Sequence, residues 1–257
     1  MAYLKDDLVS YWKMDETSDG SEAITRVDSH GSNDLTDNNT TKSGTGKINN
    51  CADMTLANDE YLSVADNSTL DFTTEMSISC WFNMDNAPSG EAICISAKWT
   101  YDSTATFGIQ VHQDNSDDIE IYIADRQDDP GDNKLSTTNA SLSADTWYHL
   151  VVVYNGAGAD NDAKLKVYIN GVEKSTSFIG SIPASLINST APLNIGDWGG
   201  SLDRKWDGLI DEFGIWGRVL TQAEITQLYN NGDGLSYDNF PVASTETDDD
   251  TCGYFNV

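Results

Sequence analysis

The feature that most restricts the fold is a series of short segments in which apolar and polar residues alternate. Loops rich in Asp, Asn, Ser, Thr and Gly separate these segments. Alternation with a period of two places the apolar side chains on one face of a β-strand. The sequence therefore predicts strands at 77–84, 92–99, 107–113, 119–125, 147–156 and 163–175.

Turn and capping signals add two further elements. Asn170-Gly171, inside the last of these segments, is a strong signal for a two-residue hairpin. Near the C-terminus, Thr221 and Glu224 have the spacing of a helix capping box. We therefore expect the only substantial helix between about 221 and 231. Many short strands with one helix predict an all-β, two-sheet antiparallel sandwich with a short C-terminal helix.

The chain has 257 residues, which is enough for one large all-β domain or two small ones. We expect one domain over residues 1–239 and a tail over 240–257. The tail contains three consecutive aspartates and ends in CGYFNV, which is apolar enough to dock on another protein. A disordered tail is the alternative.

The charge balance excludes several partners. With 42 acidic residues against 14 Lys and Arg, the formal net charge is −28. Such a surface repels nucleic acid and anionic membranes. No apolar run is long enough to insert into a membrane, and the N-terminus lacks the pattern of a signal peptide.

The four cysteines show no CxxC pair, so a zinc site is not expected. Cys80 and Cys94 could lie opposite each other across a hairpin centred near residues 86–88 and form a disulfide. Buried free thiols are the alternative.

Two adjacent acids, Asp211 and Glu212, interrupt the apolar segment LIDEFGIW. Strict alternation would place Asp211 on the core-facing row with Phe213 and Ile215, and Glu212 on the opposite row as an ordinary solvated acid. An ionised carboxylate in a core-facing row is costly unless a cation or several hydrogen-bond donors neutralise it.

Five motifs occur in an order that resembles a laminin G-like domain of the concanavalin A-like lectin/glucanase superfamily, in its bacterial and phage branch. The resemblance covers roughly residues 4–235 and rests on LVSYWKMDE, TEMSISCWFNM, DTWYHLVVVYNG with AKLKVYINGVEKS, LNIGDWGG and DGLIDEFGIWGRVLTQAEITQLYNNG. It implies a jelly roll of two curved sheets. It also implies binding to glycans, proteins or cell surfaces, often with one calcium ion.

The resemblance further implies where that calcium lies, namely at the rim of the sandwich. Asp211 matches the acid of the closing strand, and Asp15 matches the region after the first strand. Asp53 is a third match, although the glycine that often follows the acid in the family is missing. The alternative is that Asp211 accepts backbone N–H bonds without a metal.

The superfamily also contains glycoside hydrolases, so a divergent hydrolase has to be considered. Hydrolysis needs two carboxyl groups across a sugar-binding cleft, and the E-x-D-x-x-E pattern of laminarinase-type enzymes is missing. The nearest match is Asp118 with Glu120, which we interpret as an exposed polar row. We therefore predict a protein that binds and does not catalyse.

The loop 196–208 is the predicted binding site. Aromatic faces can stack on sugar rings while neighbouring charged groups bind hydroxyls. The candidate ligand-binding residues are Trp198, Trp206, Asp197, Asp203 and Arg204. The alternative for both tryptophans is packing in the core or at its rim.

Bacteriophage decoration proteins and tail fibres are similar in using such domains as added modules. We therefore expect an adhesion or decoration module on a virion surface that recognises a glycan or cell surface. Its tail would contact capsid or tail proteins, and self-association into a homo-oligomer is compatible with the sequence. A secreted, lectin-like carbohydrate-binding protein is the alternative.

Overall fold

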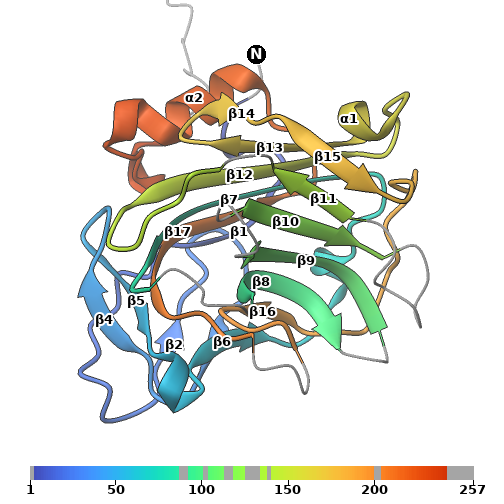
Figure 1. The fold of residues 1–257 in the computed structure, drawn as a ribbon. Coiled ribbons are helices and arrows are strands. Elements are labelled where there is room, and N and C mark those ends of the chain that lie inside the picture. Colours follow the sequence, from blue (N-terminus) through green and yellow to red (C-terminus); the bar gives the residue numbers. More distant parts are fainter. Residues whose placement is uncertain are drawn as a thin grey trace, which may run out of the picture.

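The computed structural model describes residues 3–86, 92–100, 104–112, 118–124, 134–137, 140–199 and 204–241. Two antiparallel β-sheets pack face to face, and α2 covers the outer side of one of them (Figure 1). This architecture confirms the predicted two-sheet antiparallel sandwich with one short helix near the C-terminus.

The eight-stranded sheet contains the closing strand β17 near its centre. Its order is β14 (Val172–Glu173), β13 (Leu165–Ile169), β12 (Tyr148–Asn155), β7 (Glu75–Met84), β17 (Gly208–Trp216), β5 (Asn50–Met54) and β4 (Lys42–Thr45). The eighth strand, β1 (Leu8–Trp12), pairs with the C-terminal half of β17.

The nine-stranded sheet forms the other layer. Its order is β15 (Thr176–Ile179), β11 (Lys134–Thr137), β10 (Asp118–Ile123), β9 (Thr104–His112), β8 (Ile93–Thr100), β16 (Leu193–Ile195), β6 (Tyr61–Val64), β3 (Leu35–Asn38) and β2 (Thr25–Arg26). The α-helices within the described residues are α1 (Asn161–Lys164) and α2 (Gln222–Tyr229). Single 3₁₀ turns cover Leu56–Asn58, Ser68–Leu70, Asn230–Gly232 and Tyr237–Asn239.

The main core lies between the sheets. It is built from alternate residues of the long strands, such as Ile119 and Ile121 of β10 and Val152 of β12, which are almost completely buried. A second apolar cluster lies on the outer side of the eight-stranded sheet, where Ile225 and Leu228 of α2 pack with Trp216. The helix is held at its start by the predicted capping box of Thr221 and Glu224.

The hairpin predicted at Asn170-Gly171 is also present. Both residues have positive φ angles, 53° and 77°, which is the backbone that a tight two-residue turn requires. Ile169 and Val172 pair directly on either side of the turn.

Cys80 and Cys94 do not form a disulfide. The hairpin expected between them is not formed, because β7 belongs to one sheet and β8 to the other. Cys51, Cys80 and Cys94 are free and buried, which agrees with the alternative interpretation. Cys252 and almost all of the predicted tail lie outside the described residues. Among the residues that the structure describes, no helix is long and apolar enough to cross a membrane.

Candidate functional site

The outer face of the nine-stranded sheet carries a polar cluster centred on Glu120. Ile119 and Ile121 of β10 face the core, so Glu120 and Tyr122 project from the other side of the sheet. The sequence predicted an exposed polar row here, but Glu120 is only 3% exposed. Its carboxylate is covered by side chains of the adjacent strands.

Three side chains donate hydrogen bonds to the Glu120 carboxylate. Gln110 Nε2 on β9 and the Tyr122 hydroxyl lie 2.8 and 3.0 Å from Oε2, and Lys134 Nζ on β11 lies 2.5 Å from Oε1. The strand register explains the arrangement, because Glu120 is paired with Gln110 and Tyr122 is paired with Lys134. Cross-strand neighbours on one face are close enough to interact directly.

These contacts fix the charge of the cluster. Burial raises the pKa of Glu120, but the hydrogen bonds from Lys134 and Gln110 outweigh it, so the pKa lies below its ordinary value. Burial, followed by the charge of Glu120, raises the pKa of Tyr122. At neutral pH Glu120 is therefore a carboxylate that accepts hydrogen bonds, and Tyr122 is an uncharged phenol.

The connection from β16 to β17 brings Arg204 to the same face. Arg204 Nη1 donates to Gln110 Oε1 at 3.1 Å, so Gln110 links the guanidinium to Glu120. The guanidinium also lies 5.3 Å from the centre of the Trp198 ring. We call Glu120, Gln110, Tyr122, Lys134 and Arg204 the Glu120 cluster. The last three are partly exposed and can reach a ligand, whereas the first two are buried beneath them.

The structure corrects the role predicted for Trp198. The ring is 2% exposed and packs against Trp99 and Tyr122, with centroid distances of 5.0 and 5.2 Å. An indole that is covered to this extent offers no face on which a sugar can stack. Its position depends on Gly108 of β9, where an added Cβ would lie only 2.4 Å from the Trp198 ring.

We expect Gly108→Ala to destabilise the protein by about 1–3 kcal/mol, because the new methyl group overlaps the Trp198 ring. Chemical denaturation of the variant measures this. Gly217→Ala is the matched control, since the nearest neighbours of its added Cβ are at 3.9 Å. Equal stability of the two variants would show that Trp198 is not held against β9.

The remaining residues of the predicted loop site have other positions. Trp206 is completely buried in the main core, at 5.6 Å from the Phe82 ring, so its predicted role in stacking is wrong as well. Asp197 is buried and pairs with Lys205 at 3.0 Å. Asp203 lies outside the described residues. Arg204 is the predicted loop residue that the structure brings to a partly exposed polar site.

A second group of interest lies at a β-bulge in β17. This strand pairs with β5 up to Ile210 and with β1 from Phe213, and its register against β7 shifts between Asp211 and Gly214. Ile210 and Phe213 both face the core, which strict alternation forbids. The predicted core-facing row of Asp211, Phe213 and Ile215 is therefore not formed.

Asp211 points instead toward the connection between β4 and β5. Its carboxylate accepts the backbone N–H groups of Ile48 and Glu212, each at 2.9 Å. Burial raises the pKa of Asp211 to about 8, since these two hydrogen bonds only partly offset the lost solvation. The nearby charges of Glu212 and Asp15 raise it further.

Glu212 is not the solvated acid that alternation predicted. Its side chain is 3% exposed, and its backbone has a positive φ of 48°. Neither carboxylate oxygen has a hydrogen-bond partner of good geometry, although the Tyr11 hydroxyl lies near enough to lower its pKa. Burial nevertheless raises the pKa of Glu212 to about 7, with a contribution from Asp15. The bulge is the physical reason, because it turns Glu212 away from solvent.

Asp15, Asp211 and Glu212 form what we call the carboxylate cluster. Asp15 contacts Lys13 at 3.4 Å, and its charge acts on both other acids. Asp53 is not part of the cluster, because it pairs with Leu209 on β17 and its charge does not appear among the influences on the pKa of Asp211 or Glu212. Within the part of the chain that the structure describes, no three metal-ligand residues are arranged to hold an ion. The unpartnered oxygens of Glu212 are the feature that fits a hard cation such as calcium.

Sequence reasoning missed Gln110, Tyr122 and Lys134. Two signals were available, namely the polar positions at matching places in adjacent predicted strands and a lysine in a very acidic stretch. Neither could be used without the strand order, because side chains from three strands meet only once the register is known.

The comparison with protein families decides the classification. A laminin G family model, described as the concanavalin A-like lectin/glucanases superfamily, matches residues 56–226. The chain belongs to this superfamily. No curated protein matches the chain. Membership of a phage branch is a prediction that this match does not test.

Solved structures of other lectin-like domains share the fold of this superfamily member. The binding domain of Paraclostridial Mosquitocidal Protein 1 is 18% identical with a TM-score of 0.64, covering 88% of this chain and 52% of its own. Domain 4 of AbnA, a GH43 extracellular arabinanase from Geobacillus stearothermophilus, was solved in complex with arabinotriose. It is 18% identical with a TM-score of 0.61, and the match covers 86% of this chain and 97% of the arabinanase domain. The receptor-binding domain of botulinum neurotoxin D is 17% identical with a TM-score of 0.59, and the match covers 88% of this chain and 53% of the toxin domain.

The chain therefore spans about half the length of the two toxin domains and nearly all of the arabinanase domain. At these identities the likeness concerns the fold alone. The function has to be argued from the residues of this chain.

Proposed function

We propose that this domain is a non-catalytic carbohydrate-binding module and that the Glu120 cluster holds the sugar. The observation that carries the proposal is the construction of the cluster. Partly exposed Tyr122, Lys134 and Arg204 are oriented by buried Glu120 and Gln110 through hydrogen bonds of 2.5–3.1 Å. Binding sites need exposed groups of this kind held by a buried supporting layer.

The chemistry of these groups suits a ligand rich in hydroxyls. Arg204 uses one of its N–H donors on Gln110, and a guanidinium carries five donors. The Tyr122 oxygen can still accept a hydrogen bond after donating to Glu120. The solved arabinanase domain was bound to arabinotriose, and the botulinum neurotoxin D domain is a receptor-binding domain. These relatives support a glycan or cell-surface ligand for the present chain.

The same geometry argues against catalysis at Glu120. A general acid for glycoside hydrolysis needs a raised pKa so that it is protonated near neutral pH. The pKa of Glu120 is lowered, and its carboxylate is occupied by three donors. Release of reducing sugar from any polysaccharide by the purified protein would overturn this part of the proposal.

The test is a glycan array followed by titration calorimetry on the best ligand. We expect Tyr122→Phe and Arg204→Gln each to weaken binding about tenfold, since each removes a hydrogen bond to the ligand. Lys42→Gln is the matched control, because it removes a charge from an exposed position on the other sheet. Normal binding by both cluster variants would place the sugar elsewhere, and a chain that binds no glycan would remove the proposal.

The biological setting and the calcium ion stay predictions. Attachment to a virus particle depends on the tail, whose residues from 242 onward lie outside the described part of the chain. Deleting residues 241–257 should leave the sandwich folded and abolish incorporation into particles. The calcium site was predicted at Asp15, Asp211 and Asp53, and in the described part of the chain no three such residues are arranged to hold an ion. Calcium binding is therefore tested through its effect on the stability of the carboxylate cluster.

A further inference from the structure

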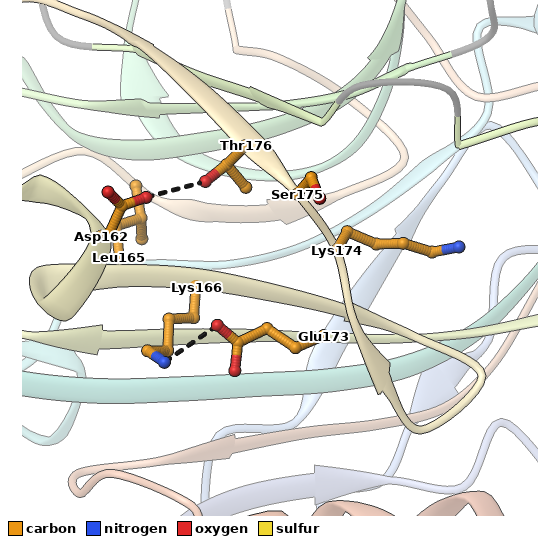
Figure 2. A pocket seen from close by; sticks show the side chains of 7 residues that line it. All are labelled: Asp162, Leu165, Lys166, Glu173, Lys174, Ser175 and Thr176. Atoms are coloured by element: carbon orange, nitrogen blue, oxygen red, sulfur yellow. Dashed lines mark hydrogen bonds and ion pairs between the residues drawn. The ribbon is translucent and has the colours of Figure 1, made fainter.

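A groove lies where the free edges of the two sheets meet. Its walls come from α1, β13 and β14 on one side and from β15 on the other, as Figure 2 shows. β14 and β15 stand at the ends of their sheets in the described strand order, so the groove opens at the edge of the sandwich. Its volume is about 370 Å³, within the range of about 300–1,000 Å³ that small-molecule sites occupy.

The polar groups that line this edge groove are held in place by one another. Thr176 Oγ1 donates to Asp162 Oδ1 at 3.3 Å, and Lys166 Nζ pairs with Glu173 Oε1 at 2.9 Å. Figure 2 shows the Asp162–Thr176 pair, which joins α1 to β15, and the Lys166–Glu173 pair, which joins β13 to β14. Leu165 also borders the groove, but its side chain is completely buried in the main core. The accessible lining is therefore made of polar side chains, two pairs of which are fixed by hydrogen bonds.

The charges of the lining indicate the class of ligand. Asp162 and Glu173 balance Lys166 and Lys174, so the edge groove is neutral within a chain of net charge −28. An anionic ligand would meet two carboxylates and the repulsion of the whole chain, and a cationic ligand would meet two lysines. An uncharged ligand with many hydroxyls can use the carboxylates as acceptors and the ammonium groups as donors.

We propose that the edge groove is a second saccharide subsite, which takes one or two uncharged sugar rings. This inference rests on the proposed carbohydrate-binding function. The groove shares no lining residue with the Glu120 cluster, so the two subsites are separate. A polysaccharide that reaches both would gain avidity, because its second contact is intramolecular.

The test compares the two subsites in the intact protein. Titration calorimetry with arabinotriose and a panel of other neutral trisaccharides should give two sites per chain. The double variant Asp162→Asn/Thr176→Val keeps the shape of the edge groove but removes its facing pair. It should lose one site, with affinity there falling at least about tenfold. Tyr122→Phe should weaken the other site only.

Lys174→Gln is a second groove variant, used in case the double variant does not fold. Denaturation curves show whether each variant is folded. A trisaccharide of uronic acids should bind the groove more weakly than a neutral one. One site that is lost only in Tyr122→Phe would overturn the edge-groove subsite and leave the proposed function intact. Two sites that persist in both groove variants would also overturn it. Binding to no saccharide at all would remove both proposals, and preference for the charged trisaccharide would refute the assigned ligand class.

Discussion

Trp206→Ala is expected to lower the free energy of unfolding by about 3–5 kcal/mol, the usual cost of truncating a large buried aromatic side chain. The indole is completely buried in the main core and meets the Phe82 ring edge to face at 5.6 Å. The indole therefore holds the segment between β16 and β17 against the centre of the eight-stranded sheet. Guanidinium denaturation of the variant measures the loss.

Val172→Ala is the control for this experiment, because Val172 is 63% exposed and its truncation removes little packing. Trp206→Ala with wild-type stability and weakened glycan binding would contradict the structure. It would restore the stacking role that the sequence predicted. Loss of stability with glycan affinity retained in the folded fraction is the expected outcome.

The architecture could be predicted because its signals are local. Alternation in the segment around Ile121 reflects the side chains that face the main core, and the Asn170-Gly171 turn needs only its own backbone angles. The capping box of Thr221 and Glu224 is local too. The disulfide expectation and the face of Asp211 depended on strand order and on a bulge, which are properties of the assembled sheets.

The candidate site was harder to predict for the same reason. A tryptophan in a polar loop has the same local sequence whether it stacks on a ligand or packs on a sheet. Gly108, far away in the chain, makes room for Trp198, and its role appears only once β9 lies beneath the loop. Arg204 was predicted as a ligand-binding residue and lies at a partly exposed polar site, whereas its hydrogen-bond partner Gln110 was not predicted.

The stability of the metal-free protein is expected to fall as the pH rises from about 5 to 9, through the carboxylate cluster. The pKa values of Asp211 and Glu212 are raised by burial to about 8 and about 7. The folded state therefore binds more protons than the unfolded state between the ordinary carboxyl pKa near 4 and these raised values. The stabilisation is complete below that window and is lost as the pH rises through it.

Glu212→Gln isolates this effect from the other carboxyl groups, because the amide resembles the protonated acid and does not titrate. Its stability relative to wild type should increase by about 3 kcal/mol across this window, since one pKa unit corresponds to about 1.4 kcal/mol. Glu173→Gln, at an exposed position, is the control and should follow the wild type. Denaturation curves at fixed ionic strength in chelator measure both.

Calcium gives this experiment its second arm, because a bound cation would stabilise the ionised carboxylates and reverse the dependence on pH. If the carboxylate cluster binds calcium, added calcium should restore the stability of the wild type at pH 8–9 and leave Glu212→Gln unchanged. If calcium changes neither protein, the calcium prediction is wrong. Asp211 is then held by the N–H groups of Ile48 and Glu212, and the cluster contributes to stability only while it is protonated. A wild type whose stability does not fall relative to Glu212→Gln between pH 5 and 9 would show that Glu212 is solvated after all.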